Sequence, residues 1–99
     1  MAHRFAILLV LLAAAPALPR TSPATLEDAV KTAEQEMGRS HQRVAEALEN
    51  LAEAHRLQGR MPEAEKSLRR ALEIRRAGLG KDHRLTRQTE RLLLEVIRP

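Results

Sequence analysis

Residues 37–41 read Met-Gly-Arg-Ser-His, and residues 79–83, which lie 42 positions later, read Leu-Gly-Lys-Asp-His. At each of these positions an apolar residue, a glycine, a basic residue, a helix-capping residue or a histidine is matched by its own kind. The same offset places Leu26 on Leu68. A fixed period of about 20–50 residues is the sequence signature of repeat proteins. The sequence therefore predicts a structural unit of 42 residues that occurs, whole or in part, more than once.

Four segments have apolar residues at the spacing of an amphipathic helix. These expected helices span residues 26–37, 41–57, 61–78 and 83–97. Short oxygen-bearing side chains precede three of them and are the expected N-caps: Thr25, Ser40 and Asp82. Gly38 and Gly59 are expected to end the first two helices. The predicted fold class is therefore all-α, with antiparallel helix pairs forming a short α-solenoid.

The expected core is built almost without aromatic residues, because Phe5 is the only one in the chain. Leu and Ala side chains allow helix axes to approach to the lower end of about 8–10 Å. In the first helix the expected buried stripe is Leu26, Ala29, Val30, Ala33 and Met37. In the last helix it is Leu85, Leu92, Leu93, Val96 and Ile97. His55 is expected to be a partly buried core residue.

Residues 41–83 resemble the tetratricopeptide repeat, and in particular the longer repeats of the kinesin light chain type. The matching residues are His41, Val44, Ala45, Leu48, Asn50, Leu51, Ala52, Gly59, Glu63-Ala64-Glu65, Arg69–Arg75 and Leu79–His83. The chain departs from that pattern with Gln42 in place of Pro, His55 in place of Tyr, and Leu68 in place of an aromatic residue. The resemblance implies a tetratricopeptide-like domain over residues 25–99 that binds a protein or peptide and does not catalyse a reaction.

The N-terminal segment has the order of parts found in a secretory signal peptide. A short basic start, Met1 to Arg4, precedes an apolar run over residues 5–15, and Ala15-Pro16-Ala17 gives small residues at a cleavage site. The apolar run is shorter than the roughly 20 residues that a membrane-spanning helix needs. We therefore expect a signal peptide over residues 1–17, a flexible leader over 18–24, and a periplasmic or secreted protein with no stable membrane insertion after cleavage.

Polar residues of the second helix share a face that resembles the concave wall of tetratricopeptide arrays. This face carries Glu46, Glu49, Asn50 and Glu53, and the last helix would add Gln88 and Arg91. In the family an asparagine at the position of Asn50 often contacts the backbone of a bound peptide. The functional interpretation is a groove for a basic, extended peptide, and the alternative is a solvated helix surface.

Other functional classes lack their characteristic residues. The chain has no cysteine, which excludes disulfides, thiolate zinc sites and cysteine nucleophiles. It contains no nucleotide-binding or hydrolase motif, so no cofactor, metal or catalytic site is expected. His41 and His83 are equivalent by repeat and are expected to be structural residues at helix starts. Nucleic acid is not an expected partner, because the basic C-terminal half has no aromatic residues between its charges.

A second interpretation is a structural unit that forms homo-oligomers through an exposed C-terminal helix. Apolar residues crowd that helix at Leu92, Leu93, Leu94, Val96 and Ile97, and a solenoid of fewer than about three repeats leaves such a surface uncovered. Charge is also polarised, with nine acids and five bases over residues 27–65 and four acids and nine bases over residues 69–99. A third interpretation is a remnant of a longer repeat protein.

Overall fold

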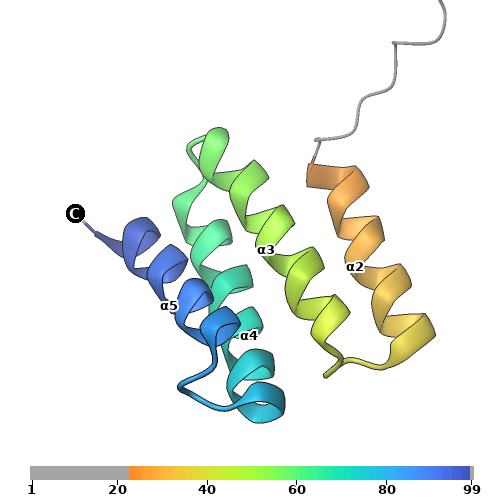
Figure 1. Ribbon diagram of the computed structural model, residues 1–99. Helices are drawn as coiled ribbons and strands as arrows, with labels where there is room; N and C mark the ends of the chain where they lie inside the picture. Colours follow the sequence, from red (N-terminus) through yellow and green to blue (C-terminus); the bar gives the residue numbers. More distant parts are fainter. Residues whose placement is uncertain (1–22, 99) are drawn as a thin grey trace, which may run out of the picture.

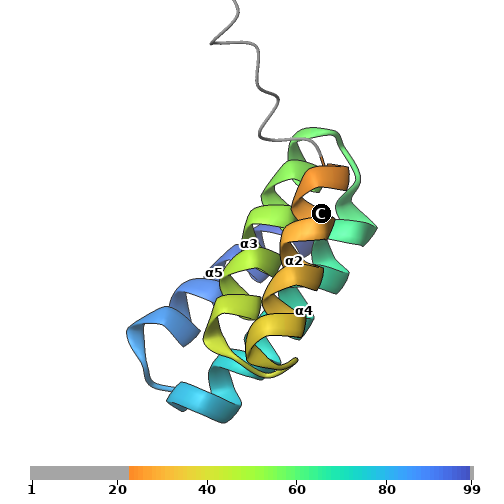
Figure 2. The ribbon, with the colours of Figure 1, turned by 90° about the vertical axis from the view of Figure 1, so that its right-hand side faces the viewer.

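The computed structural model describes residues 23–98, which form four helices joined by short turns (Figure 1). The helices are α2 (Pro23–Met37), α3 (Gln42–Leu57), α4 (Met61–Leu79) and α5 (Arg84–Ile97). No strand occurs within this range. Successive helices run antiparallel and stack in chain order, so that α2 and α5 lie at opposite ends of the array (Figures 1 and 2). The predicted all-α class is confirmed.

The N-terminal part of the sequence analysis falls mostly outside the described range. The expected signal peptide over residues 1–17 and residues 18–22 of the expected leader lie there. Helix α2 begins at Pro23, earlier than predicted, because proline is tolerated in the first turn of a helix where its missing N–H has no partner to lose. Thr25 therefore lies inside α2 and is not its N-cap. No helix between residues 23 and 98 is long and apolar enough to cross a membrane.

Histidines, and not the expected Ser40 and Asp82, cap the two helices that begin equivalent repeats. His41 Nδ1 accepts a hydrogen bond from the backbone N–H of Arg43 at 3.1 Å. His83 Nδ1 accepts one from Leu85 at 3.0 Å. Each helix starts one residue later than predicted, and the imidazole then takes the role that short side chains usually fill. The prediction that both histidines are structural residues at helix starts is confirmed.

Glycines at equivalent positions end α2 and α4. Gly38 and Gly80 have φ angles of 92° and 88°, a region that residues with a Cβ rarely adopt. Helices α2 and α4 end 42 positions apart, at Met37 and Leu79, and α3 and α5 begin 42 positions apart. The internal repeat read from the sequence is therefore a repeat of structure.

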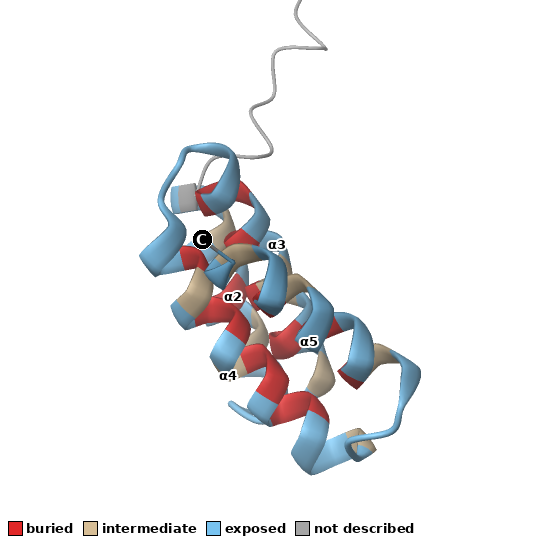
Figure 3. Cartoon of the chain, turned by 90° about the vertical axis from the view of Figure 1, so that its left-hand side faces the viewer, coloured by how far each residue is buried: buried red, intermediate tan, exposed pale blue. Residues whose placement is uncertain are grey.

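Two apolar clusters hold the helices together, and buried residues face the interior while the outer sides of the helices are exposed (Figure 3). The first cluster joins α2, α3 and α4 through Val30, Val44, Ala45, Leu48, Leu51, Ala71 and Ile74. The second joins α3, α4 and α5 through Ala52, Ala64, Leu68, Leu72 and Leu93. His55 is only 5% exposed, so its predicted place in the core is confirmed.

The two end helices bury less than predicted. Ala29 is exposed, Met37 is 44% exposed and Ile97 is 41% exposed, because no further helix in the described range covers these sides of α2 and α5. By contrast, Thr86 and Thr89 are almost fully buried. The Thr89 hydroxyl donates to the Leu85 carbonyl at 2.9 Å, which satisfies its polar group within the helix.

Candidate functional site

The polar face of α3 is divided between exposed and engaged side chains. Glu46 and Asn50 are exposed, whereas the side chain of Glu49 keeps only 13% of its accessible surface. Glu53 is exposed on the same helix but is paired within it. The polar face predicted from the sequence is therefore present, and its carboxylates differ in exposure and in ion pairing.

Glu49 is held by a buried arginine of α4. Arg75 Nη2 donates to Glu49 Oε1 at 2.6 Å, and Arg75 Nη1 donates to Gln42 Oε1 at 3.2 Å. Gln42 in turn donates its Nε2 to the Ile74 carbonyl at 3.1 Å. Removing one partner of a buried ion pair typically costs about 3–5 kcal/mol, because the other charge is left without compensation. This network fixes α3 against α4 beneath the predicted groove.

Glu53 forms a two-pronged ion pair with Arg56, one turn further along α3. Arg56 Nε donates to Glu53 Oε2 at 2.9 Å and Nη2 donates to Oε1 at 2.5 Å. These hydrogen bonds lower the pKa of Glu53 below 4.5 against the opposing effect of partial burial. The same hydrogen bonds raise the pKa of Arg56. Both side chains remain exposed to solvent, so the pair contributes little to stability.

A cleft of about 310 Å³ lies between α3 and α5. Its lining residues are Glu46, Glu49, Asn50, Arg75, Leu85 and Gln88. The structure thus brings together four of the six residues predicted for the groove, from two helices that are not adjacent in sequence. Arg75 is an addition that the sequence analysis missed.

A second cleft, of about 360 Å³, adjoins the first along α3. It lies between α2 and α3 and is lined by Ala29, Thr32, Ala33, Glu36, Met37, Arg43, Glu46, Ala47 and Asn50. Glu46 and Asn50 line both clefts. Asn50 therefore stands where a ligand crossing from α2 toward α5 would pass.

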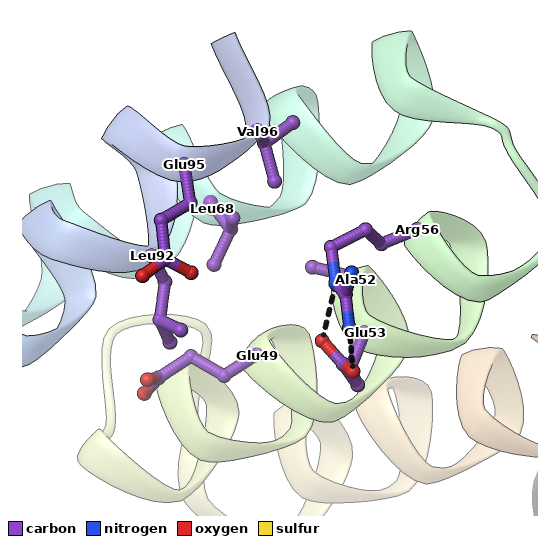
Figure 4. A pocket seen from close by; sticks show the side chains of 8 residues that line it. All are labelled: Glu49, Ala52, Glu53, Arg56, Leu68, Leu92, Glu95 and Val96. Carbon is purple, nitrogen blue, oxygen red and sulfur yellow. Dashed lines mark hydrogen bonds and ion pairs between the residues drawn. The ribbon is translucent and has the colours of Figure 1, made fainter. Parts of the chain in front are cut away.

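The remaining two predicted residues lie away from this path. Glu53 lines a small pocket with its neighbours Glu49 and Arg56, below α5 (Figure 4). The apolar part of its lining comes from Ala52, Leu68, Leu92 and Val96. Its volume of about 20 Å³ is close to that of one water molecule, so it is not a ligand cleft. Arg91 is exposed on α5 and lines neither of the two larger clefts.

The histidines and carboxylates do not converge on a metal site. Between residues 23 and 98 no group of three or more such side chains could hold a metal ion. His55 Nδ1 is buried and has no hydrogen-bond partner within the described residues, as is also true of Arg75 Nε. Burying these polar atoms without a hydrogen-bond partner lowers the stability of the fold.

Two comparisons with known proteins bear on this geometry. A family model described as "Tetratricopeptide repeat" matches residues 24–77 and again residues 43–96. The two overlapping matches cover almost the whole described range, including α3 and both clefts. No curated protein sequence matches the chain.

Proposed function

The chain belongs to the tetratricopeptide repeat family, and on that premise we propose that it is an adaptor which binds an extended segment of another protein. Repeats of this family generally mediate protein–protein interaction. Stacked helical repeats create concave surfaces that accommodate extended chains. The proposed binding surface is the pair of clefts along α3, with Asn50 at their junction.

The cleft between α3 and α5 is the observation that supports this proposal most strongly. It places two primary amides, Asn50 and Gln88, on facing helices beside an apolar side chain, Leu85. A primary amide can both donate and accept hydrogen bonds, as a peptide backbone does. An extended backbone lying in this cleft would find complementary groups on both walls.

The charges of the groove refine the expected ligand. Glu49 is neutralised by Arg75 and Glu53 by Arg56, whereas Glu46 has no ion pair within residues 23–98. The groove is therefore less acidic than its sequence suggests, and a strongly basic peptide is no longer favoured. We expect recognition through the peptide backbone and one or two side chains.

A panning experiment with a random peptide display library tests the site without knowledge of the natural partner. Peptides selected on the wild-type protein are measured for binding to the Asn50→Ala/Gln88→Ala variant. Loss of two amide contacts is expected to weaken binding at least about fivefold, since each hydrogen bond contributes about 0.5–1.5 kcal/mol. Helicity, measured by circular dichroism, is expected to stay unchanged because both side chains are exposed.

The matched control is Lys31→Ala, which removes an exposed side chain of α2 that lines neither cleft. Binding to this variant is expected to equal that of the wild type. Equal binding of the selected peptides to all three proteins would overturn the groove assignment. Failure of the library to yield any binder would count against a peptide-binding function.

We also propose that the chain is exported and acts in the periplasm or outside the cell. The support is the apolar run of residues 5–15 followed by small residues at Ala15 and Ala17. N-terminal sequencing of the protein from its native host is expected to begin at Leu18. A chain that retains its N-terminal residues would contradict this part of the proposal.

A role without catalysis and without nucleic acid completes the proposed function. Its support is the absence from the whole sequence of hydrolase and nucleotide-binding motifs and of cysteine. It is supported further by the family, which is typically non-catalytic. The proposed partners are proteins or peptides.

A further inference from the structure

The outer side of α5 is exposed although its equivalent in α3 is buried. With the repeat offset of 42, the residues of α3 that face α4 correspond to exposed residues of α5, of which Glu90 forms an ion pair with Arg76 of α4. Gln42, Ala45, Leu48 and Ala52 correspond in this way to Arg84, Arg87, Glu90 and Leu94. All four of these α5 residues are exposed, and Leu94 is 53% exposed. The open side of α5 is therefore the counterpart of a helix-packing surface.

The outer side of α2 is the complementary open surface. Helix α2 corresponds to α4, and the α4 residues that meet α3 have exposed counterparts on α2, which line the cleft between α2 and α3. Ala71, Ile74 and Gly78 correspond to Ala29, Thr32 and Glu36, all of which are exposed. One end of the array therefore exposes a surface equivalent to the side of α3 that packs on α4, and the other end exposes a surface equivalent to the side of α4 that packs on α3.

We propose that copies of this chain associate head to tail, with α5 of one copy packed on α2 of the next as α3 packs on α4 within a chain. The established α3–α4 contact supplies the geometry of this interface. The interface shares Ala29, Thr32 and Glu36 with the cleft between α2 and α3, so a second copy would compete with a peptide bound in that cleft. Each contact between α3 and α4 predicts a contact between copies. In it, the α3 residue is replaced by its equivalent in α5 of one copy, and the α4 residue by its equivalent in α2 of the next.

At the start of α5, the predicted contact between copies contains an ion pair that the equivalent contact between α3 and α4 lacks. Within the chain the Gln42 amide lies directly against Gly78, where any Cβ would collide with it. Between copies the equivalent residues are Arg84 and Glu36. Their opposite charges attract, and the long arginine side chain can adapt to the space that a glutamate needs.

The contact near the helix end stays apolar. Ala52 and Leu68 belong to one buried cluster, and their counterparts between copies are Leu94 and Leu26. Covering Leu94 would remove from water one of the most exposed large apolar side chains of the described region.

Charge complements these contacts along the two helices. Helix α2 has four acidic residues and one lysine, a net charge of −3. Helix α5 has three arginines and two glutamates, a net charge of +1. Neither Arg84 nor Arg87 has an ion-pair partner within residues 23–98. A second copy brings the acidic helix to the arginines.

The expected interface is weaker than the α3–α4 contact that serves as its template. Arg87 and Glu90 stand where α3 has the buried Ala45 and Leu48. The centre is therefore polar, and the contact relies on exposed charges that salt screens. We expect reversible association that lengthens with concentration, because a head-to-tail contact leaves one open surface at each end.

Sedimentation velocity on two charge-reversal variants tests the arrangement. One variant, Arg84→Glu/Arg87→Glu, changes only α5, and the other, Glu36→Lys, changes only α2. Each variant is made both in the whole chain and in the form that begins at Leu18. Each is compared with the wild type of the same length, so that any effect of residues 1–17 is the same on both sides of the comparison. All substituted residues are exposed, and circular dichroism confirms that each variant is folded.

The wild type is expected to associate with an apparent dissociation constant that rises at least about tenfold between 50 and 500 mM NaCl. Each variant alone is expected to be monomeric, and their mixture is expected to associate again. If the α2 variant still self-associates, the contact joins α5 to α5 and the proposal is overturned. A wild type that remains monomeric at several hundred micromolar overturns it as well, and then something other than a second copy covers α5.

Discussion

His41 and His83 occupy a position that serine, threonine or aspartate fills in most helices. Each imidazole accepts a backbone hydrogen bond through Nδ1, which satisfies one of the free N–H groups of the first turn. The glycine three residues earlier lets the chain turn back sharply enough to present the ring to the helix. Sequence alone identified these histidines as structural, but it assigned the cap to the residue before each, because the usual capping statistics favour Ser40 and Asp82.

The cap at α5 can be tested by exchange of its acceptor. His83→Ala is expected to lower the free energy of unfolding by about 1 kcal/mol, since an N-cap contributes about 0.5–2 kcal/mol. His83→Asn keeps an acceptor of suitable length and is expected to recover most of that loss. Urea unfolding followed by circular dichroism measures both variants. Equal stability of the alanine and asparagine variants would show that the hydrogen bond is unimportant.

The ion pair of Glu53 predicts a pH dependence at one residue. Its pKa lies below 4.5 because Arg56 donates two hydrogen bonds to the charged carboxylate. The small stability from this pair is therefore fully present above about pH 4.5 and is lost as the pH falls through the lower pKa of the folded state. An NMR titration of the Glu53 carboxyl carbon is expected to have its midpoint below 4.5. In Arg56→Gln the midpoint is expected to move upward, and an unchanged midpoint would contradict the stated cause.

Residue types and spacing predicted part of the candidate site. Asn50 and Gln88 could be placed in one groove because the repeat puts α3 and α5 on the same side of the array. Arg75 could not be found in this way, because an arginine on an otherwise apolar helix face gives no sign of its partner. Its bond to Glu49 depends on the exact crossing of α3 and α4, which periodicity does not specify.

At the scale of the elements, α5 has two adjacent leucines with different environments. Leu93 is 6% exposed and packs in the second cluster, whereas Leu94 is 53% exposed. Leu93→Ala is expected to destabilise the fold by about 2–4 kcal/mol, as for other buried leucines. Leu94→Ala is expected to change stability by less than about 0.5 kcal/mol. Thermal unfolding at low concentration, where chains are separate, measures both, and similar losses would contradict the orientation of α5.

Helix positions were predictable, whereas the burial of the end helices was not. The four predicted segments agree with α2 to α5 to within a few residues, because glycines and apolar spacing mark them. The expected exposed apolar edge near the C-terminus is present at Leu94 and Ile97. Leu92 and Val96, however, pack against the second cluster, so charged substitutions there would damage the fold itself. The direction in which the array continues decides which side of α5 is buried, and the period of a single helix does not reveal it.

At the scale of the whole molecule, stability comes from contacts between successive helices. The described helices pack as α2 on α3, α3 on α4 and α4 on α5. In such arrays the total stability is approximately a sum of unit and nearest-neighbour contributions. The central helices α3 and α4 each have two neighbours in chain order, whereas α2 packs mainly on α3 and α5 mainly on α4. The family could be predicted from the sequence because each helix pair that packs on the next one appears in the sequence as a repeat with an offset of 42 residues.

Hydrogen exchange is expected to reflect that order. Amides in α3 and α4 are expected to exchange slowest, and those of α2 and α5 to exchange through local opening. Exchange of backbone amides, followed by NMR at low protein concentration, measures this directly. Uniform protection across all four helices would show that the domain opens only as one unit.

The junctions at Gly38 and Gly80 have a consequence for how such a protein can grow. Because both joints share one backbone geometry and one cap, duplicating the gene segment for residues 38–79 would create no joint that the chain does not already have. The second copy of α3 would meet α4 where α5 now does, and the other contacts of the added helices would copy existing ones. Length in this architecture is therefore set by copy number, and it can change in a single recombination event without a new fold.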